Sequence, residues 1–170
     1  MNNKFSISQF NNKHQFDVQE MVIEGLMDTA HDYGGKVIEG VSAYLQKSLS
    51  EDLGSIESYY SKRGSFFIAK HNGDVIGSLG VQVEIKDIYR LKRLSVKKLF
   101  RKIGVAEALL LTVEEWIKKQ NGSEIIIGTS EVQKAAVKFW QKSGFVIEDI
   151  NKSESGIKLY SMRKFLRPDS

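Results

Sequence analysis

Apolar residues recur at helical spacing in two stretches near the N-terminus, on either side of Tyr33-Gly34-Gly35. Spacings of three and four residues place side chains on one face of a helix. The two sets are Val18, Met21, Val22, Leu26, Met27 and then Val37, Val41, Tyr44, Leu45, Leu49. The pattern therefore predicts that two amphipathic helices open the chain.

A β-hairpin is predicted next, because two β-rich runs over 66–69 and 75–83 flank the turn dipeptide Asn72-Gly73. The following strand, about 88–96, changes the parity of its apolar positions from Tyr89 and Leu91 to Leu94 and Val96. A strand cannot bury both sets on one face without an extra residue. We therefore expect a β-bulge near Lys92 or Arg93.

The C-terminal half alternates helices and strands. A helical stripe over 105–117 ends at Asn121-Gly122, and a strand over 124–129 follows. Ser130 and Gln133 have the spacing of a capping box, which predicts a helix start there. Two strands, over 145–150 and 157–162, complete the chain. This order predicts a mixed sheet flanked by helices.

Composition narrows the classes of protein without changing this order. A chain of 170 residues, 41% of them hydrophobic, is expected to form one globular domain. It has no cysteine, which excludes disulfides, a thiolate nucleophile and a cysteine zinc site. Its three histidines are far apart and lack metal-binding spacing, so we expect no metal. The absence of an apolar leader or a spanning run predicts a cytoplasmic location and no membrane partner.

Positive charge is concentrated in one segment of a chain whose formal net charge is +4. Every charged residue between 90 and 102 is basic, namely Arg90, Lys92, Arg93, Lys97, Lys98, Arg101 and Lys102. Such a segment attracts an anionic ligand or forms a solvated, nonspecific face. A nucleic-acid-binding module is a further hypothesis, but interleaved aromatics and a recognition motif are missing, so no nucleic-acid partner is expected.

The segment Arg101-Lys102-Ile103-Gly104-Val105-Ala106 lies between a predicted strand and a predicted helix. Unpaired backbone N–H groups at a helix start bind anions, and small residues let a phosphate come close. Arg101 and Lys102 add positive charge, so a pyrophosphate is the expected ligand. The alternative is simply a helix with small residues in its first turn.

Leu94-Ser95-Val96, then Arg101-x-x-Gly104-x-Ala106 and Ala108-Leu109-Leu110, resembles the acetyl-CoA motif of the GNAT superfamily of N-acyltransferases. The stretch from Thr129 through Gln133 to Phe145 resembles that family's closing signature. The resemblance implies an α/β (α+β) fold with a mixed, mostly antiparallel central sheet of about six to seven strands, splayed beside a bulged fourth strand. It also implies a single N-acetyltransferase domain over 1–170, with a variable helical part (1–50), a family core (51–150) and a terminal strand and tail (151–170).

The resemblance further implies how acetyl-CoA, the expected co-substrate, is held. Backbone groups of Leu94 to Val96 would pair with the pantetheine arm, and a backbone N–H of Leu94 or Val96 would stabilise the oxyanion. The implied cofactor-binding residues are Leu94, Ser95, Val96, Arg101, Lys102, Ile103, Gly104, Val105, Ala106, Gln133, Ala136 and Trp140. Gln133 also suits a helix cap, and Trp140 also suits a core position on a helix face.

Two positions depart from the family pattern. Trp140 stands where a tyrosine usually protonates the leaving thiolate, and Arg90 stands where many members carry a glutamate. The remaining candidates are Tyr160 or Tyr89 as the acid, and Glu84 or Asp87 as the base; we take Glu84 and Tyr160 as the catalytic candidates. Deprotonating an alkylammonium costs about 4.6 kcal/mol at neutral pH, whereas a thiol needs only about 2 kcal/mol to leave as thiolate. The missing base therefore matters more.

The leading hypothesis is direct acetyl transfer to a primary amine of a small molecule or peptide, in a ternary complex. The form Thr129-Ser130-x-x-Gln133 resembles members that act on amino-acid-like amines or cysteine conjugates, and the basic residues 90–93 favour a carboxylated acceptor. An acyl-CoA-binding sensor without turnover is the alternative, motivated by Trp140 and Arg90. A homodimer is left open.

Overall fold

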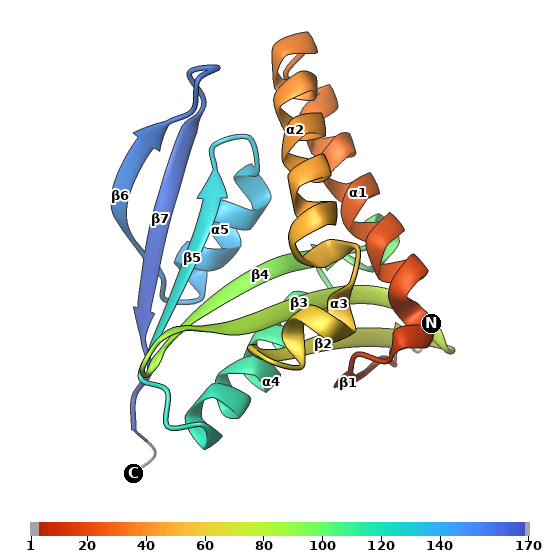
Figure 1. The fold of residues 1–170 in the computed structure, drawn as a ribbon, viewed down its shortest axis with the longest axis vertical. Coiled ribbons are helices and arrows are strands. Elements are labelled where there is room, and N and C mark those ends of the chain that lie inside the picture. The colour runs from red at the N-terminus through yellow and green to blue at the C-terminus, as the bar shows by residue number, and fades with distance from the viewer. Residues whose placement is uncertain (1–3, 169–170) are drawn as a thin grey trace.

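The computed structural model describes residues 4–168, and its centre is a seven-stranded sheet of order β1-β2-β3-β4-β5-β7-β6 (Figure 1). The strands are β1 (Ser6–Gln9), β2 (Gly64–His71), β3 (Asp74–Ile85), β4 (Ile88–Val96), β5 (Glu124–Ser130), β6 (Val146–Lys152) and β7 (Lys158–Phe165). Neighbouring strands are antiparallel except β4 and β5, which are parallel. The predicted mixed, mostly antiparallel sheet flanked by helices is confirmed.

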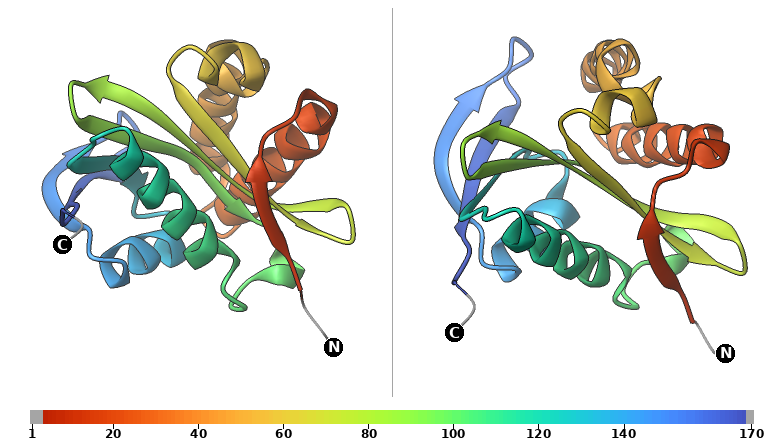
Figure 2. Two further views of the ribbon diagram at one scale, coloured as in Figure 1. Left: turned by 90° about the horizontal axis from the view of Figure 1, so that it is seen from below. Right: turned by 60° about the horizontal axis from the view of Figure 1, so that its bottom comes forward.

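Helices cover both faces of the sheet (Figure 2). One face carries α1 (Gln15–His31), α2 (Gly35–Ser48) and α3 (Ile56–Tyr60), with the π-helix η2 (Leu49–Leu53) between the last two. The other face carries α4 (Val105–Lys119) and α5 (Lys134–Lys142). Two 3-10 turns, η1 (Asn12–His14) and η3 (Lys98–Phe100), precede α1 and α4.

Two hydrophobic cores lie on the two sides of the sheet. Side chains alternate along β2, so that Phe66 and Ile68 pack with α1 and α3, while Phe67 and Ala69 pack beneath α4. Both sets are buried. A strand buried on both faces needs an uninterrupted apolar run, which explains why the sequence reads Phe-Phe-Ile-Ala without polar alternation.

The predicted helices and hairpin are confirmed, but the structure adds elements that the pattern did not reveal. Asn72 and Gly73 both have positive φ, as the two-residue hairpin turn requires. A short edge strand, β1, precedes the first helix and pairs with β2 from Ser6 opposite Lys70. β1, η2 and α3 are each too short to show a hydrophobic period, so the sequence pattern could not separate them from loops.

The predicted capping box at Ser130 is wrong. Ser130 is still part of β5, paired with Leu159, and α5 begins only at Lys134. Gln133 is the N-cap residue, but its side chain makes no capping hydrogen bond. Instead, the Thr129 hydroxyl lies 3.5 Å from Gln133 Oε1. Sheet pairing therefore took precedence over the local capping signal.

Candidate active site

β4 contains the bulge that the sequence predicts. Ser78 pairs with Ser95 and Gly80 pairs with Lys92, so one residue of β3 lies opposite two residues of β4. Arg93 occupies the extra position with φ of 64°, and the buried Ser78 hydroxyl donates a hydrogen bond of 2.8 Å to the Arg93 carbonyl. This hydrogen bond holds a backbone conformation that non-glycine residues adopt only rarely.

The bulge changes which side chains face which layer. Before it, Tyr89 and Leu91 pack in the core beneath α4; after it, Leu94 and Val96 pack there instead. Lys92 and Arg93, adjacent in the chain, both reach the opposite layer, where they contact η2. The bulge therefore places two consecutive basic side chains on the same face of the sheet, next to η2.

The sheet opens beside this bulge. β4 and β5 pair only where Ile88, Tyr89 and Arg90 lie opposite Glu124, Ile125 and Ile126, and the strands diverge beyond that point (Figure 1). The edge of β4 from 94 to 96 therefore has no pairing partner on β5 among the described residues. The predicted splay beside a bulged fourth strand is confirmed, and this free strand edge suits an extended amide-containing ligand.

The loop after β4 leads into an open helix start. Lys102 and Gly104 both have positive φ, and Gly104 is the N-cap of α4 without a side-chain cap. A Cβ atom on Gly104 would meet nothing within 4 Å, so the space in front of the helix is free of protein. The first N–H groups of α4 are thus available to an anion, as the anion-site prediction requires.

Neighbouring contacts fix this helix start. A Cβ atom on Gly77 would lie 2.9 Å from Val105, so glycine there allows α4 to approach β3 closely. Arg101 is exposed and donates from Nε to the Val96 carbonyl at 3.0 Å, which ties the loop to the end of β4. The hydroxyl of Ser95 faces Gly25 of α1.

The predicted cofactor-binding residues of α5 lie beside the same core. Trp140 is only 5% exposed and makes edge-to-face contacts with Phe139 and Phe145 at centroid distances of 5.1 and 5.0 Å. Ala136 is partly buried against this core. The position of Trp140 matches the alternative reading of it as a core residue.

The two catalytic candidates lie on opposite faces of the sheet. Both oxygens of Glu84 accept hydrogen bonds from Arg90, at 2.9 and 3.1 Å, which lowers the pKa of Glu84. This pair sits where β4 and β5 are still joined. Tyr160, on β7 opposite Thr129, packs against the α4 core. The structure therefore does not bring Glu84 and Tyr160 together.

The two other candidates are engaged elsewhere. Tyr89 packs edge-to-face on Trp116, and its burial raises the pKa of the phenol. A hydrogen bond from Ser123 lowers the pKa of Asp87, which makes this exposed carboxylate a weak base.

A buried ion pair beneath the bulge was not predicted. Asp52, on η2, is fully buried and accepts hydrogen bonds from Arg93 Nε (3.0 Å), Arg93 Nη2 (2.5 Å) and the Tyr60 hydroxyl (2.6 Å). Arg93 also donates to the Tyr44 hydroxyl at 2.8 Å. Burial by itself would raise the pKa of Asp52, but the hydrogen bonds and charge of Arg93, together with Tyr60, lower it. The burial of Tyr60 and the negative charge of the neighbouring Asp52 raise the pKa of Tyr60.

A second, more exposed ion pair lies next to the first. Lys92 Nζ is 3.0 Å from Glu51 Oε1 and 3.9 Å from Asp52 Oδ1, and it lies over the Tyr59 ring. The sequence contains a weak signal for this cluster, since the acidic pair 51–52 is the charge complement of the basic pair 92–93. The members are 41 positions apart, however, and nothing in the local pattern shows that they meet.

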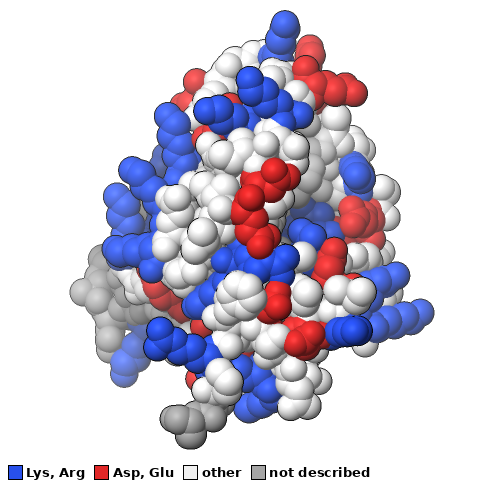
Figure 3. Space-filling view, turned by 90° about the vertical axis from the view of Figure 1, so that its left-hand side faces the viewer, with Lys and Arg blue, Asp and Glu red and all other residues white. Residues whose placement is uncertain are grey.

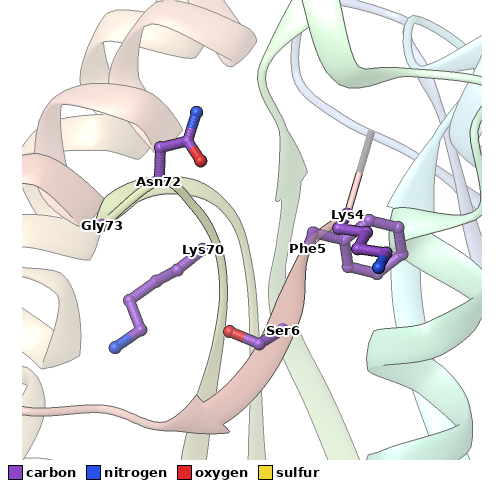
Figure 4. Close-up of a pocket in the computed structure, with 6 residues that line it drawn as sticks. All are labelled: Lys4, Phe5, Ser6, Lys70, Asn72 and Gly73. Carbon is purple, nitrogen blue, oxygen red and sulfur yellow. The ribbon is translucent and has the colours of Figure 1, made fainter. Parts of the chain in front are cut away.

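The rest of the described surface shows no comparable candidate site. A shallow hollow between β1 and the β2–β3 hairpin is lined by Lys4, Phe5, Ser6, Lys70, Asn72 and Gly73 (Figure 4), and none of them is a predicted site residue. On the face that Figure 3 shows, acidic side chains interrupt the basic ones. Within 4–168 no cluster of three or more metal-ligating side chains occurs, and no helix has the length and apolarity to cross a membrane. The cytoplasmic location, the homodimer and the lack of a nucleic-acid partner stay predictions.

Comparison with known proteins agrees with this geometry. The sequence model of the family described as "Acetyltransferase (GNAT) domain" matches residues 29–166. N-acetylaspartate synthetase from Rattus norvegicus is 37% identical over 128 residues, which cover 74% of this chain and 42% of that protein. N-acetyltransferase 8 from Homo sapiens is 35% identical over 109 residues, which cover 60% of this chain and 48% of that protein. The chain thus spans less than half the length of these curated relatives.

Solved structures share the fold over nearly the whole chain. PaiA N-acetyltransferase from Thermoplasma acidophilum, in complex with coenzyme A, superposes with a TM-score of 0.80 at 19% identity, covering 96% of this chain and 99% of that one. An acetyltransferase of the GNAT family from Staphylococcus aureus Mu50 gives a TM-score of 0.77 at 20% identity, covering 96% of this chain and all of that one. With a family match over most of its length and this shared architecture, the chain belongs to the GNAT family of acetyltransferase domains.

Proposed function

We propose that the protein transfers an acetyl group from acetyl-CoA to the primary amine of a small, carboxylated acceptor. The observation that carries this proposal is the opening between β4 and β5, which lies directly beside the uncapped start of α4. One ligand can therefore pair with the strand edge and place its diphosphate at the helix start. Acetyl-CoA has both parts.

The residues of the donor site fit this ligand. Backbone groups of Leu94, Ser95 and Val96 line the free edge of β4, and the loop from Arg101 to Ala106 supplies N–H groups and positive charge. The open space at Gly104 leaves room for phosphate oxygens. The solved relative in complex with coenzyme A has the same fold, which supports the assignment.

The reaction needs few protein groups. The acceptor nitrogen attacks the thioester carbonyl carbon, the C–N bond forms, and the C–S bond breaks with its electron pair on sulfur. The nitrogen loses a proton and sulfur ends as a thiol, so atoms and charge balance. A backbone N–H of Leu94 or Val96 beside the bulge stabilises the oxyanion that forms in between.

Proton transfer is where this chain departs from its family. Arg90 lowers the pKa of Glu84, so Glu84 is a weak base even though the sequence predicts it. An acceptor amine of low pKa eases this problem, and an α-amino group near pKa 8 is such an amine. Tyr160 stays the predicted general acid. The thiolate leaves more easily without an acid than the ammonium group loses its proton without a base.

The acceptor class rests on two observations. Lys92 and Arg93 both project from the bulge into the layer of α1 and α2, where they pair with Glu51 and Asp52, so a lysine ammonium that can bind a carboxylate lies on this side of the bulge. The relatives that are named N-acetylaspartate synthetase share 37% identity over most of this chain. Both observations support a small acceptor with a carboxylate.

A panel of amines tests this proposal. The protein is incubated with acetyl-CoA and each amine, free CoA is measured, and the acetylated product is identified by mass. We expect CoA release that depends on a primary amine and is fastest with carboxylated acceptors. Saturable binding of acetyl-CoA without any turnover would instead establish the alternative, an acyl-CoA-binding sensor, which the burial of Trp140 in place of an acidic tyrosine favours.

A further inference from the structure

The two ion pairs at the bulge differ in how freely they can exchange partners. The side chains of Arg93 and Asp52 are 4% and 0% exposed, whereas those of Lys92 and Glu51 are 15% and 44% exposed. A buried charge that loses its partner is strongly destabilised, but an exposed pair is worth about 0–1 kcal/mol. Glu51–Lys92 is the more exposed of the two pairs, through Glu51, so it is the one that opens to a ligand at the lower cost.

Hydrogen bonding separates the two pairs in the same way. Arg93 uses Nε and Nη2 on Asp52 and Nη1 on Tyr44, so all three of its nitrogens are engaged. The carboxylate of Asp52 is also bonded by Tyr60. Arg93 is thus committed to the protein and is poorly suited to bind a substrate carboxylate, although its charge supports one nearby.

The Glu51–Lys92 pair lies near the point where β4 and β5 diverge. Lys92 is on β4, two residues beyond Arg90, the last residue that pairs with β5. Glu51 lies on η2, between α2 and α3, in the layer opposite α4 (Figures 1 and 2). The Tyr59 ring supports the Lys92 ammonium from one side, at 5.5 Å from its centroid. The pair therefore presents one positive and one negative group two residues before Leu94, whose backbone N–H is a proposed oxyanion donor.

We propose that the Glu51–Lys92 ion pair recognises the acceptor as a zwitterion, with Glu51 binding the α-ammonium group and Lys92 binding the α-carboxylate of a free amino acid; the ammonium group releases a proton to water before its nitrogen attacks the thioester. This inference rests on the proposed function and names its acceptor class. A free amino acid carries an ammonium group and a carboxylate group on the same α-carbon. Its dipole can therefore lie antiparallel to the dipole of the Glu51–Lys92 pair. Each charge of the protein then keeps an opposite charge beside it.

This arrangement predicts discrimination by charge. An amine whose α-carboxylate is replaced by a carboxamide keeps the contact with Glu51 but loses the one with Lys92. A dipeptide or protein N-terminus loses it for the same reason, because its first carboxyl group is an amide. Free amino acids are therefore the preferred acceptors, ahead of peptides.

The test compares L-amino acids with their α-carboxamides as acceptors for three lysine variants. In Lys92→Met, which keeps the apolar stem, we expect KM for the amino acids to rise at least tenfold, with KM for the carboxamides and for acetyl-CoA unchanged. Lys92→Arg should restore part of the preference. The matched control is Lys164→Met, which removes a lysine from the half-buried pair with Glu114, between β7 and α4. It should leave the preference as in wild type.

Glu51→Gln gives a second, independent signature. Because both acceptor types carry the ammonium group, KM should rise for amino acids and carboxamides alike. The proposal is overturned if Lys92→Met leaves the preference intact, or if it weakens both acceptor types equally. Should the wild type release no CoA with any amine, the proposed function fails. Calorimetry then measures the affinity of the protein, loaded with acetyl-CoA, for each amino acid and for its α-carboxamide. The ratio of these two affinities in wild type and in Lys92→Met decides the role of Lys92.

Discussion

The proposed donor region and the proposed acceptor region of this protein are built in contrasting ways. The donor region is a continuous stretch of backbone from the edge of β4 through Gly104 into α4, and its function depends on N–H groups and small residues. The acceptor region joins Glu51 and Asp52 of η2 to Lys92 and Arg93 of β4, 41 positions away. The first consists of residues that are continuous in the sequence, although its open strand edge depends on the divergence of β4 and β5. The second exists only when the whole domain is folded.

The acceptor region itself combines a rigid part and an exchangeable part. The buried Arg93–Asp52 pair, closed by Tyr60 and Tyr44, holds the bulge against η2. In the neighbouring Glu51–Lys92 pair, Glu51 is 44% exposed, and Lys92 also contacts Asp52 at 3.9 Å and the Tyr59 ring. Adjacent residues of η2 thus differ in burial, and we propose that Asp52 serves stability and Glu51 recognition.

Replacing Asp52 should have the largest effect. Asp52→Ala leaves the buried Arg93 guanidinium without its partner, which costs about 3–5 kcal/mol of unfolding free energy. Urea unfolding of the purified variant measures this cost. The neighbouring Glu51→Ala is the matched control and should cost about 0–1 kcal/mol, because Glu51 is 44% exposed and Lys92 keeps its contact with Asp52. Equal losses in the two variants would show that the two pairs do not differ as described.

A bulky residue in the donor loop should act on binding instead of folding. Gly104→Trp fills the open space before α4, so acetyl-CoA affinity should fall at least one hundredfold, or about 2.8 kcal/mol, in a calorimetric titration. Gly156→Trp is the matched control. Gly156 also has positive φ and open surroundings but lies between β6 and β7, so both variants carry similar backbone strain. Wild-type affinity in Gly104→Trp would disprove the donor site.

Lowering the pH should decrease the contribution of the Asp52–Arg93 pair to the free energy of unfolding. The pKa of Asp52 is lower in the folded protein than its ordinary value of about 3.9 in an unfolded chain. Its ionised form therefore contributes stability that is present above about pH 4 and is lost as pH falls through the folded-state pKa. The difference in unfolding free energy between wild type and Asp52→Asn should shrink from pH 7 to pH 3. A difference that grows toward acid pH would contradict this assignment.

Much of the fold follows from local patterns. The parity change at Tyr89, Leu91 and Leu94 located the bulge, because a two-residue period cannot shift without an inserted residue. Asn72-Gly73 located the hairpin in the same way. The capping box at Ser130 failed because β5 continues through that residue to pair with β7. Local signals were reliable where no distant strand competed with them.

The sequence by itself determined the longer helices and strands, the hairpin and the bulge, and it predicts the donor loop from Arg101 to Ala106, because each depends on side-chain periodicity or on backbone within a few residues. Only the tertiary structure decided which basic side chains are free to meet a ligand. It committed Arg93 to the buried Asp52 and paired Arg90 with Glu84, and it paired Lys92 with the more exposed Glu51. Ion pairs between distant segments depend on how whole layers pack, and no local pattern encodes that packing.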